Sequence, residues 1–128
     1  MSATNFLEDK FLLASLTGNT YTGNGTVYLA LYSTAPGESG SGTELSGSGY
    51  SRQSIAFTVN TGNGVATNTA NVVFGNATAD WSTAVAYGVI DAPSGGNILY
   101  TGNLTPSQTL LNGYNMTFQT GNVSISIN

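Results

Sequence analysis

The side chains that could carry out chemistry are few in this sequence. It contains no histidine and no cysteine, which excludes a Ser-His-Asp triad, a thiol nucleophile and a histidine-ligated zinc site. The chemistry that remains is glycoside hydrolysis, which needs a pair of carboxylates flanking the sugar linkage. The candidate carboxylates are Glu8, Asp9, Glu38, Glu44, Asp80 and Asp91.

Two of these acids have simpler roles in turns. Asp80 precedes Trp81 and can accept hydrogen bonds from backbone N–H groups, and Asp91 precedes Ala-Pro and can cap a turn. The sequence also lacks an EF-hand or nonapeptide calcium loop. We therefore predict that the protein is not an enzyme, with no catalytic residue, no cofactor and no metal ion.

Charged residues make up only 6% of the chain, against a usual share of about 25%. The two cations, Lys10 and Arg52, form no basic stripe, so we expect no nucleic-acid partner. No apolar run approaches the length of a membrane span, and the first residues lack the basic start of a secretory signal, so we expect no membrane partner and folding where the chain is made. A surface of Thr, Ser, Asn and Gly repels its copies only weakly, which favours self-association or many copies packed together.

The aromatic residues suggest a second kind of function. Trp81 and seven tyrosines could stack on sugar rings, because aromatic side chains with a polar tip suit wet binding faces. The competing interpretation is packing, since several of these tyrosines fall inside predicted strands: Tyr28, Tyr32, Tyr87 and Tyr100.

The elements that would position these residues begin with a helix over residues 5–17. Asn5 is a suitable N-cap, with Glu8 three residues later as in a capping box, and Gly18 is placed to end the helix. The apolar residues, among them Phe6 and Phe11, cover too wide an arc for a helix lying freely in water. They must be buried either on their own domain or against a neighbouring chain.

After Gly18 the hydrophobic period changes to two, which is typical of strands. The predicted strand segments are TVYLALYS, SIAFTV, ANVVF, AVAYGVID, NILYTGNL, YNMTFQT and VSISI. Turn dipeptides of the Asn-Gly type separate several of them. The sequence therefore predicts one mainly β domain over residues 1–128, an antiparallel β-sandwich or barrel of about seven strands with one short N-terminal helix.

A long Gly- and Ser-rich segment covers residues 35–53. Only one helix and one strand precede it, too little to fold alone, so it is a loop inside one domain and not a tether between two. Tyr50 and Arg52 close the loop, and both residue types are common interface anchors. The alternative is that Arg52 pairs with Glu38 or Glu44 and fixes the loop to its own domain.

Two regions resemble a family of small virion structural proteins of tailed bacteriophages, whose members are labelled as head decoration or tail-fibre proteins. The first region is YLALYSTAPGESGSGTELSGSGYSRQSIAFT, and the second is ADWSTAVAYGVIDAPSGGNILYTGNLTPSQTLLNGYNMTF. The most specific blocks are Gly49–Gln53 and Ala79–Trp81. The chain departs from the family pattern at Ser51, where the family often has Ala, and this difference hardly affects the resemblance.

The resemblance implies a non-enzymatic protein of the virion, assembled in the host cytoplasm. Its partners would be the major capsid protein or tail proteins of the same particle. We expect a capsid decoration, or cement, protein that stabilises the head. The alternatives are a tail-fibre or baseplate subunit and a carbohydrate-binding host-attachment module. The expected interface residues are Phe6, Phe11, Glu38, Glu44, Tyr50, Arg52 and Trp81.

Overall fold

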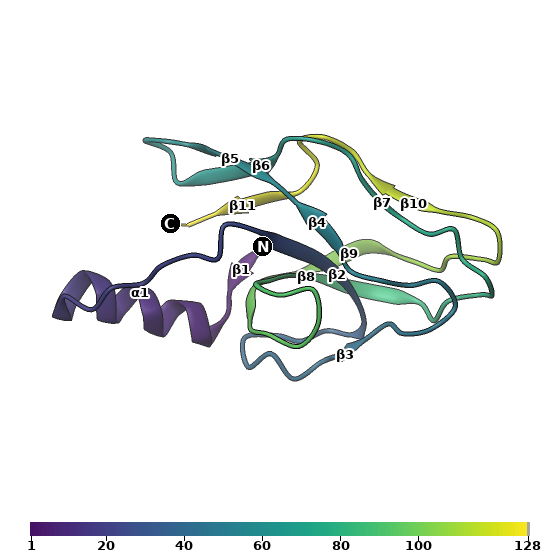
Figure 1. Ribbon diagram of the computed structural model, residues 1–128, viewed down its shortest axis with the longest axis horizontal. Helices are drawn as coiled ribbons and strands as arrows, with labels where there is room; N and C mark the ends of the chain where they lie inside the picture. Colours follow the sequence, from purple (N-terminus) through teal and green to yellow (C-terminus); the bar gives the residue numbers. More distant parts are fainter. Residues whose placement is uncertain (128) are drawn as a thin grey trace.

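A computed structural model describes residues 1–127 as a mainly β protein with one helix near the N-terminus (Figure 1). The elements in chain order are β1 (Ser2–Ala3), α1 (Asn5–Thr17), β2 (Val27–Thr34), β3 (Thr43–Glu44), β4 (Gln53–Ile55), β5 (Phe57–Asn60), β6 (Val65–Asn68), β7 (Val72–Phe74), β8 (Ala84–Ile90), β9 (Ile98–Gln108), β10 (Met116–Phe118) and β11 (Ser124–Ser126). The predicted fold class is confirmed, and the sheets do not close into a barrel.

Three antiparallel sheets make up the β structure. The largest has six strands in the order β1-β9-β8-β2-β3, and β4 pairs with the same edge of β2 as β3, nearer its start. The other two sheets are β10-β7 and β11-β6-β5. Figure 1 shows these two smaller sheets on the upper side of the molecule, with the large sheet below them.

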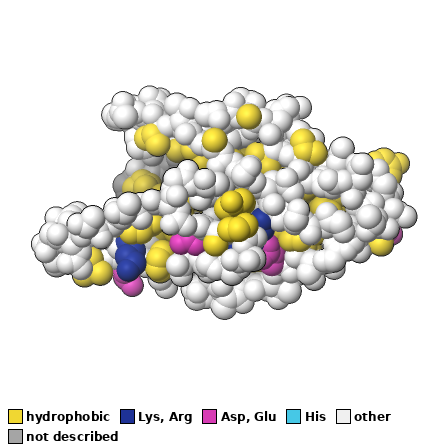
Figure 2. All heavy atoms as spheres, viewed as in Figure 1, with side chains coloured by type: hydrophobic (Ala, Val, Ile, Leu, Met, Phe, Trp, Pro, Cys, Tyr) yellow, Lys and Arg dark blue, Asp and Glu magenta, His cyan; other side chains and the backbone are white. Residues whose placement is uncertain are grey.

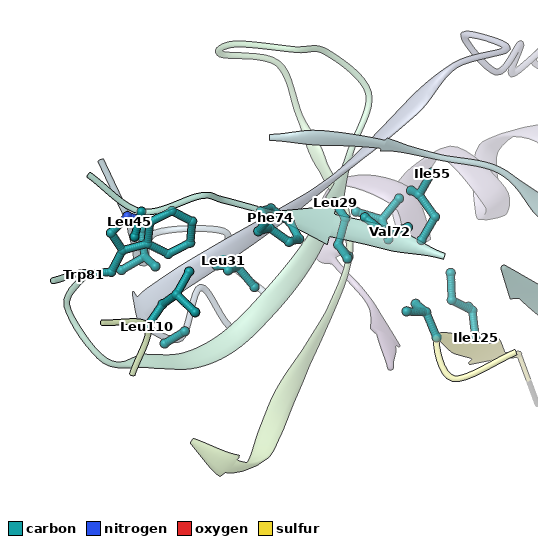
Figure 3. Close-up of a cluster of buried hydrophobic side chains, with 13 residues drawn as sticks. Leu29, Leu31, Leu45, Ile55, Val72, Phe74, Trp81, Leu110 and Ile125 are labelled. Carbon is teal, nitrogen blue, oxygen red and sulfur yellow. The ribbon is translucent and has the colours of Figure 1, made fainter. Parts of the chain in front are cut away.

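The core lies between the large sheet and the two smaller ones. Leu29 and Leu31 of β2 point into it and are completely buried. In Figure 3, Leu45, Trp81 and Leu110 lie at one end of this cluster, and Ile55, Val72 and Ile125 lie at the other, with Phe74 and Leu29 between them. The other face of β2 is buried too, because Ala30 and Tyr32 pack in a second cluster with Ala86 and Ile90.

The helix spans the predicted residues but begins differently at its cap. Thr4, not Asn5, is the N-cap, and its hydroxyl donates to the backbone carbonyl of Ile98 instead of capping the helix. The helix is thereby tied to β9 at its first turn. At the other end Gly18 ends the helix as predicted: it adopts a left-handed conformation with φ of 79°, and its N–H donates to the carbonyl oxygen of Leu13.

Burial of α1 on its own chain is incomplete. Leu7 is buried, but Leu12, Leu13 and Leu16 are exposed, with Leu16 at 76% of its full accessibility. Figure 1 shows the second half of α1 projecting at the left edge of the molecule. The helix therefore packs on its own fold through its first two turns only.

The structure contains more strands than the period-two pattern predicts. The SIAFTV segment divides at Ala56, because β4 pairs with β2 while β5 pairs with β6 in a different sheet. The two-residue strands β1 and β3 are too short to show alternation, and β6 follows directly on the Asn63-Gly64 turn.

The segment over residues 35–53 is a shaped loop that contains β3 and the start of β4. Its conformation depends on glycine at particular points. At Gly42 an added Cβ would lie 2.2 Å from the carbonyl oxygen of Thr34, and at Gly49, with φ of 83°, it would lie 2.7 Å from that of Asn76. Side chains cannot be accommodated at these positions without moving the backbone.

Candidate functional site

An ion pair at the end of the shaped loop joins three of the predicted site residues. Glu44, at the end of β3, accepts two hydrogen bonds from Arg52, from Nε at 2.9 Å and from Nη2 at 2.8 Å. The Tyr50 hydroxyl donates to the same carboxylate at 2.7 Å. The side chains of Arg52 and Glu44 are 12% and 24% exposed, so the pair is largely desolvated. Of the two alternatives for Arg52, the structure shows pairing with Glu44 inside its own fold.

Arg52 also holds a second loop. Its Nη1 donates to the carbonyl oxygens of Ala92 at 2.9 Å and Gly95 at 2.8 Å, in the loop between β8 and β9. Asp91 shapes that loop by accepting hydrogen bonds from the backbone N–H and the side-chain amide of Asn97. One guanidinium group therefore fastens two loops that lie about forty residues apart in the sequence.

Tyr50 connects the ion pair to the core. Its hydroxyl accepts a hydrogen bond from the backbone N–H of Leu31 at 3.0 Å, and its ring stacks on Phe74 with centroids 6.0 Å apart. Trp81 meets Tyr50 edge-on at 5.5 Å, and its indole N–H donates to the carbonyl of Ser48 at 2.7 Å. Since Trp81 is only 6% exposed, its ring is not available to stack on a sugar, and the sequence-based role for Trp81 in glycan stacking is wrong.

Burial and the ion pair shift the pKa values of Glu44, Arg52 and Tyr50. Burial would raise the pKa of Glu44, but the hydrogen bonds from Arg52 and Tyr50 and the Arg52 charge outweigh it, so the pKa lies below its ordinary value. The hydrogen bond to Glu44 raises the pKa of Arg52. Burial, followed by the hydrogen bond to Glu44, raises the pKa of Tyr50, so its hydroxyl stays protonated.

We predict that Glu44 makes stability depend on acid pH. Because its folded pKa is lowered, its contribution is complete above the ordinary value of 4.5 and is lost as the pH falls through the folded pKa. Urea unfolding between about pH 6 and pH 3 should show stability falling in the wild type and a shallower fall in Glu44→Gln. Glu38→Gln is the matched control, because this exposed carboxyl forms no ion pair within residues 1–127. Equal slopes in wild type and Glu44→Gln would contradict the prediction.

A cleft of about 560 Å³ lies beside this network, where the N-terminal end of α1 meets the loops before β3 and between β8 and β9. Its lining includes Asn5, Phe6, Glu38, Glu44, Arg52 and Asn97. Four of the seven predicted interface residues, Phe6, Glu38, Glu44 and Arg52, are thus brought together. Tyr50 and Trp81 lie in the core behind the ion pair, and Phe11 packs edge-on against Tyr21 at 6.2 Å.

Tyr32 and Asn97 also line the cleft, and the sequence did not single them out as site residues. Tyr32 alternates regularly with its neighbours in β2, so its pattern indicates a sheet residue and nothing more. Asn97 lies in a loop whose position depends on Arg52, a contact between residues distant in sequence. No local signal in the sequence identifies either residue.

Two other chemistry-bearing residues, Asp80 and Lys10, have structural contacts. Asp80 accepts a hydrogen bond from the backbone N–H of Asn112 at 2.8 Å, and Lys10 lies over the Phe6 ring at 5.4 Å from its centroid. Within residues 1–127 no group of three or more His, Cys, Asp or Glu side chains is placed to hold a metal ion.

In the same part of the chain, no helix has the length and apolar character needed to span a membrane. Figure 2 shows how few charged side chains interrupt the neutral surface on one face.

Comparison with known proteins gives one finding. A family model described as Gp80, Podophage GP4 fiber I protein gp80, matches residues 2–126. No curated protein matches the chain. The family match includes both segments on which the resemblance to phage virion proteins was based, and almost every residue described above.

Proposed function

The chain belongs to the family described as Podophage GP4 fiber I protein gp80, and from this membership we propose that it is a fibre subunit of a podophage particle. At the coarser level it is a bacteriophage virion structural protein, in agreement with the resemblance of its Gly49–Gln53 and Ala79–Trp81 blocks. The observation that carries the proposal is the extent of the match, which covers residues 2–126 of 128.

The second half of α1 supplies a surface for contact with another virion protein. Leu12, Leu13 and Leu16 are exposed there, and the last turn of the helix carries no basic residue. Burial of such side chains contributes about 25 cal/mol for each Å² removed from water, so a complementary apolar surface on a neighbouring protein would hold them. Phe11 on the same helix belongs to this proposed contact.

The contacts of the acidic side chains fit a structural role for the protein and not a catalytic one. Glu44 is engaged with Arg52 and Tyr50, while Asp80 and Asp91 hold backbone N–H groups of turns. Each of these three carboxylates has a role in the fold. The protein would therefore act by adhesion, through surfaces that bind other components of the particle.

Capsid decoration is the second candidate, and the size of the elements favours it. Within residues 1–127 neither a coiled coil nor a repeating shaft is present, and most strands have no more than four residues. A protein of this kind that binds only the assembled lattice stabilises that lattice by mass action. The same exposed leucines would then face the head surface.

Cryo-electron microscopy of intact particles tests the choice. We expect density for this chain in a fibre attached to the tail, with the second half of α1 against another virion protein. Particles assembled without the protein are the control and should lack that density. Density confined to the head lattice would overturn the fibre proposal in favour of decoration.

A further inference from the structure

The cleft beside α1 has the size and lining of a site for a small ligand. Its volume of about 560 Å³ lies within the range of about 300–1,000 Å³ typical of such sites. Three separate segments form its walls, and the Arg52 hydrogen bonds hold two of them in place. The cleft is therefore preformed. We propose that it binds a neutral hexopyranose sugar.

The charges of the lining argue against an anionic ligand. Arg52 is the single cationic side chain among the residues that line the cleft. Its Nε, Nη1 and Nη2 atoms all donate to protein oxygens, two on Glu44 and two on backbone carbonyls. The N-terminus of α1 lines the cleft and favours negative charge, but a phosphate or carboxylate ligand would find no unengaged guanidinium there and would also meet the carboxylate of Glu38.

The floor of the cleft provides a hydroxyl group suited to a sugar. Tyr32 is only 3% exposed and lines the cleft. Its hydroxyl makes no hydrogen bond within residues 1–127, and no fully buried side-chain polar atom there lacks a partner, so this hydroxyl keeps some contact with solvent, and the cleft is where Tyr32 lies at the surface. Burial and the nearby charge of Glu44 raise the pKa of Tyr32 to about 12, so the group remains an O–H donor.

The lining combines polar and apolar side chains, as a pyranose combines hydroxyl groups with a C–H face. The amide of Asn5, the amide oxygen of Asn97 and the carboxylate of Glu38 can bond to neighbouring hydroxyls of a sugar, while the Asn97 NH₂ group donates to Asp91. The Phe6 ring and the Ile98 side chain offer apolar surface for the C–H face of the sugar ring. This mixture, without an unengaged cation, matches a neutral polyhydroxylated ligand better than a charged or purely apolar one.

The test is a titration of the full chain followed by saturation-transfer NMR. The probes are methyl glycosides of glucose, galactose and mannose, with N-acetylneuraminic acid as the anionic probe and choline as the cationic probe. We expect at least one neutral glycoside to saturate the protein with a Kd in the millimolar range. Tyr32→Phe keeps the buried ring but removes the hydroxyl, and should weaken binding of that glycoside about five- to tenfold.

Tyr114→Phe is the matched control, since Tyr114 is 64% exposed and does not line the cleft. It should bind the glycoside as the wild type does, and amide NMR spectra should show that both variants remain folded. Equal affinity in Tyr32→Phe and wild type, binding of the acid or choline alone, or no saturation by any neutral glycoside at about 100 mM would each overturn the proposal. None of these results bears on the location of the protein in the particle, which cryo-electron microscopy tests separately.

Discussion

Replacing Trp81 with alanine should lower the free energy of unfolding by about 3–5 kcal/mol, the largest effect expected of any single substitution considered for this protein. Trp81 is buried at one end of the main core beside Leu45 and Leu110 (Figure 3). The substitution leaves a cavity under Tyr50 and removes the donor to the Ser48 carbonyl. A protein of this size is typically stable by about 5–15 kcal/mol, so much of its stability would be lost.

Urea unfolding followed by circular dichroism measures this effect, because Trp81 is the single tryptophan and the variant has no indole fluorescence. Trp81→Phe keeps an aromatic ring but not the N–H donor, and should lose less stability than the alanine variant. Tyr114→Ala, at an exposed position, should stay within about 0.5 kcal/mol of the wild type. A Trp81→Ala protein as stable as Tyr114→Ala would show that the indole does not support the core. Loss of sugar binding in Trp81→Ala would therefore not identify Trp81 as a sugar contact.

Replacing Arg52 with alanine should lower the free energy of unfolding by about 2–3 kcal/mol. Four hydrogen bonds are lost, two to Glu44 and two to the carbonyls of Ala92 and Gly95. Removal of the guanidinium also leaves the Glu44 carboxylate partly buried without its counter-ion. Arg52→Lys should recover only part of the loss, because an ammonium group cannot reproduce the fork that bridges the carboxylate and the loop.

A double-mutant cycle separates the ion pair from the loop contacts. Arg52→Ala and Glu44→Gln are each measured alone and then combined, by urea unfolding at neutral pH. Because the two side chains contact each other directly, the combined loss should be smaller than the sum of the single losses. Losses that simply add would contradict a direct interaction and would leave the backbone contacts to Ala92 and Gly95 as the whole contribution of Arg52.

The regular elements could be predicted from the sequence where the local pattern is strong. The helix ends at Gly18 as predicted because a left-handed glycine is a local signal. The N-cap is Thr4 and not the predicted Asn5, and the Thr4 hydroxyl donates to the carbonyl of Ile98, a contact between residues far apart in the sequence that no local pattern shows. β3 has two residues, so its pairing with β2 gives no periodic pattern that the sequence could reveal.

The candidate site could be predicted only in part. Residue types at the end of the Gly-rich loop indicated Arg52 pairing with an acid, but the sequence could not choose between Glu38 and Glu44. The cleft itself depends on the loop after β8 being held beside β3, which only the three-dimensional contacts of Arg52 show. Trp81 was predicted at an interface because aromatic residues are common there, whereas the aromatic packing around Tyr50 places it in the core.

The order of strands in the large sheet has a consequence for how the chain folds during synthesis. β2 lies between β8 and the short strands β3 and β4, and its register places Leu31 opposite Tyr87. The central pairing of the molecule therefore cannot form until β8 has left the ribosome, and β1 must wait longer for β9. Pairings between strands far apart in the sequence slow folding, because the intervening chain loses conformational entropy before the contacts between the strands can stabilise the fold. During that delay β2 can pair with β3 and β4, but its opposite edge has no partner, so newly made chains are most open to wrong association before the second half of the sequence is complete.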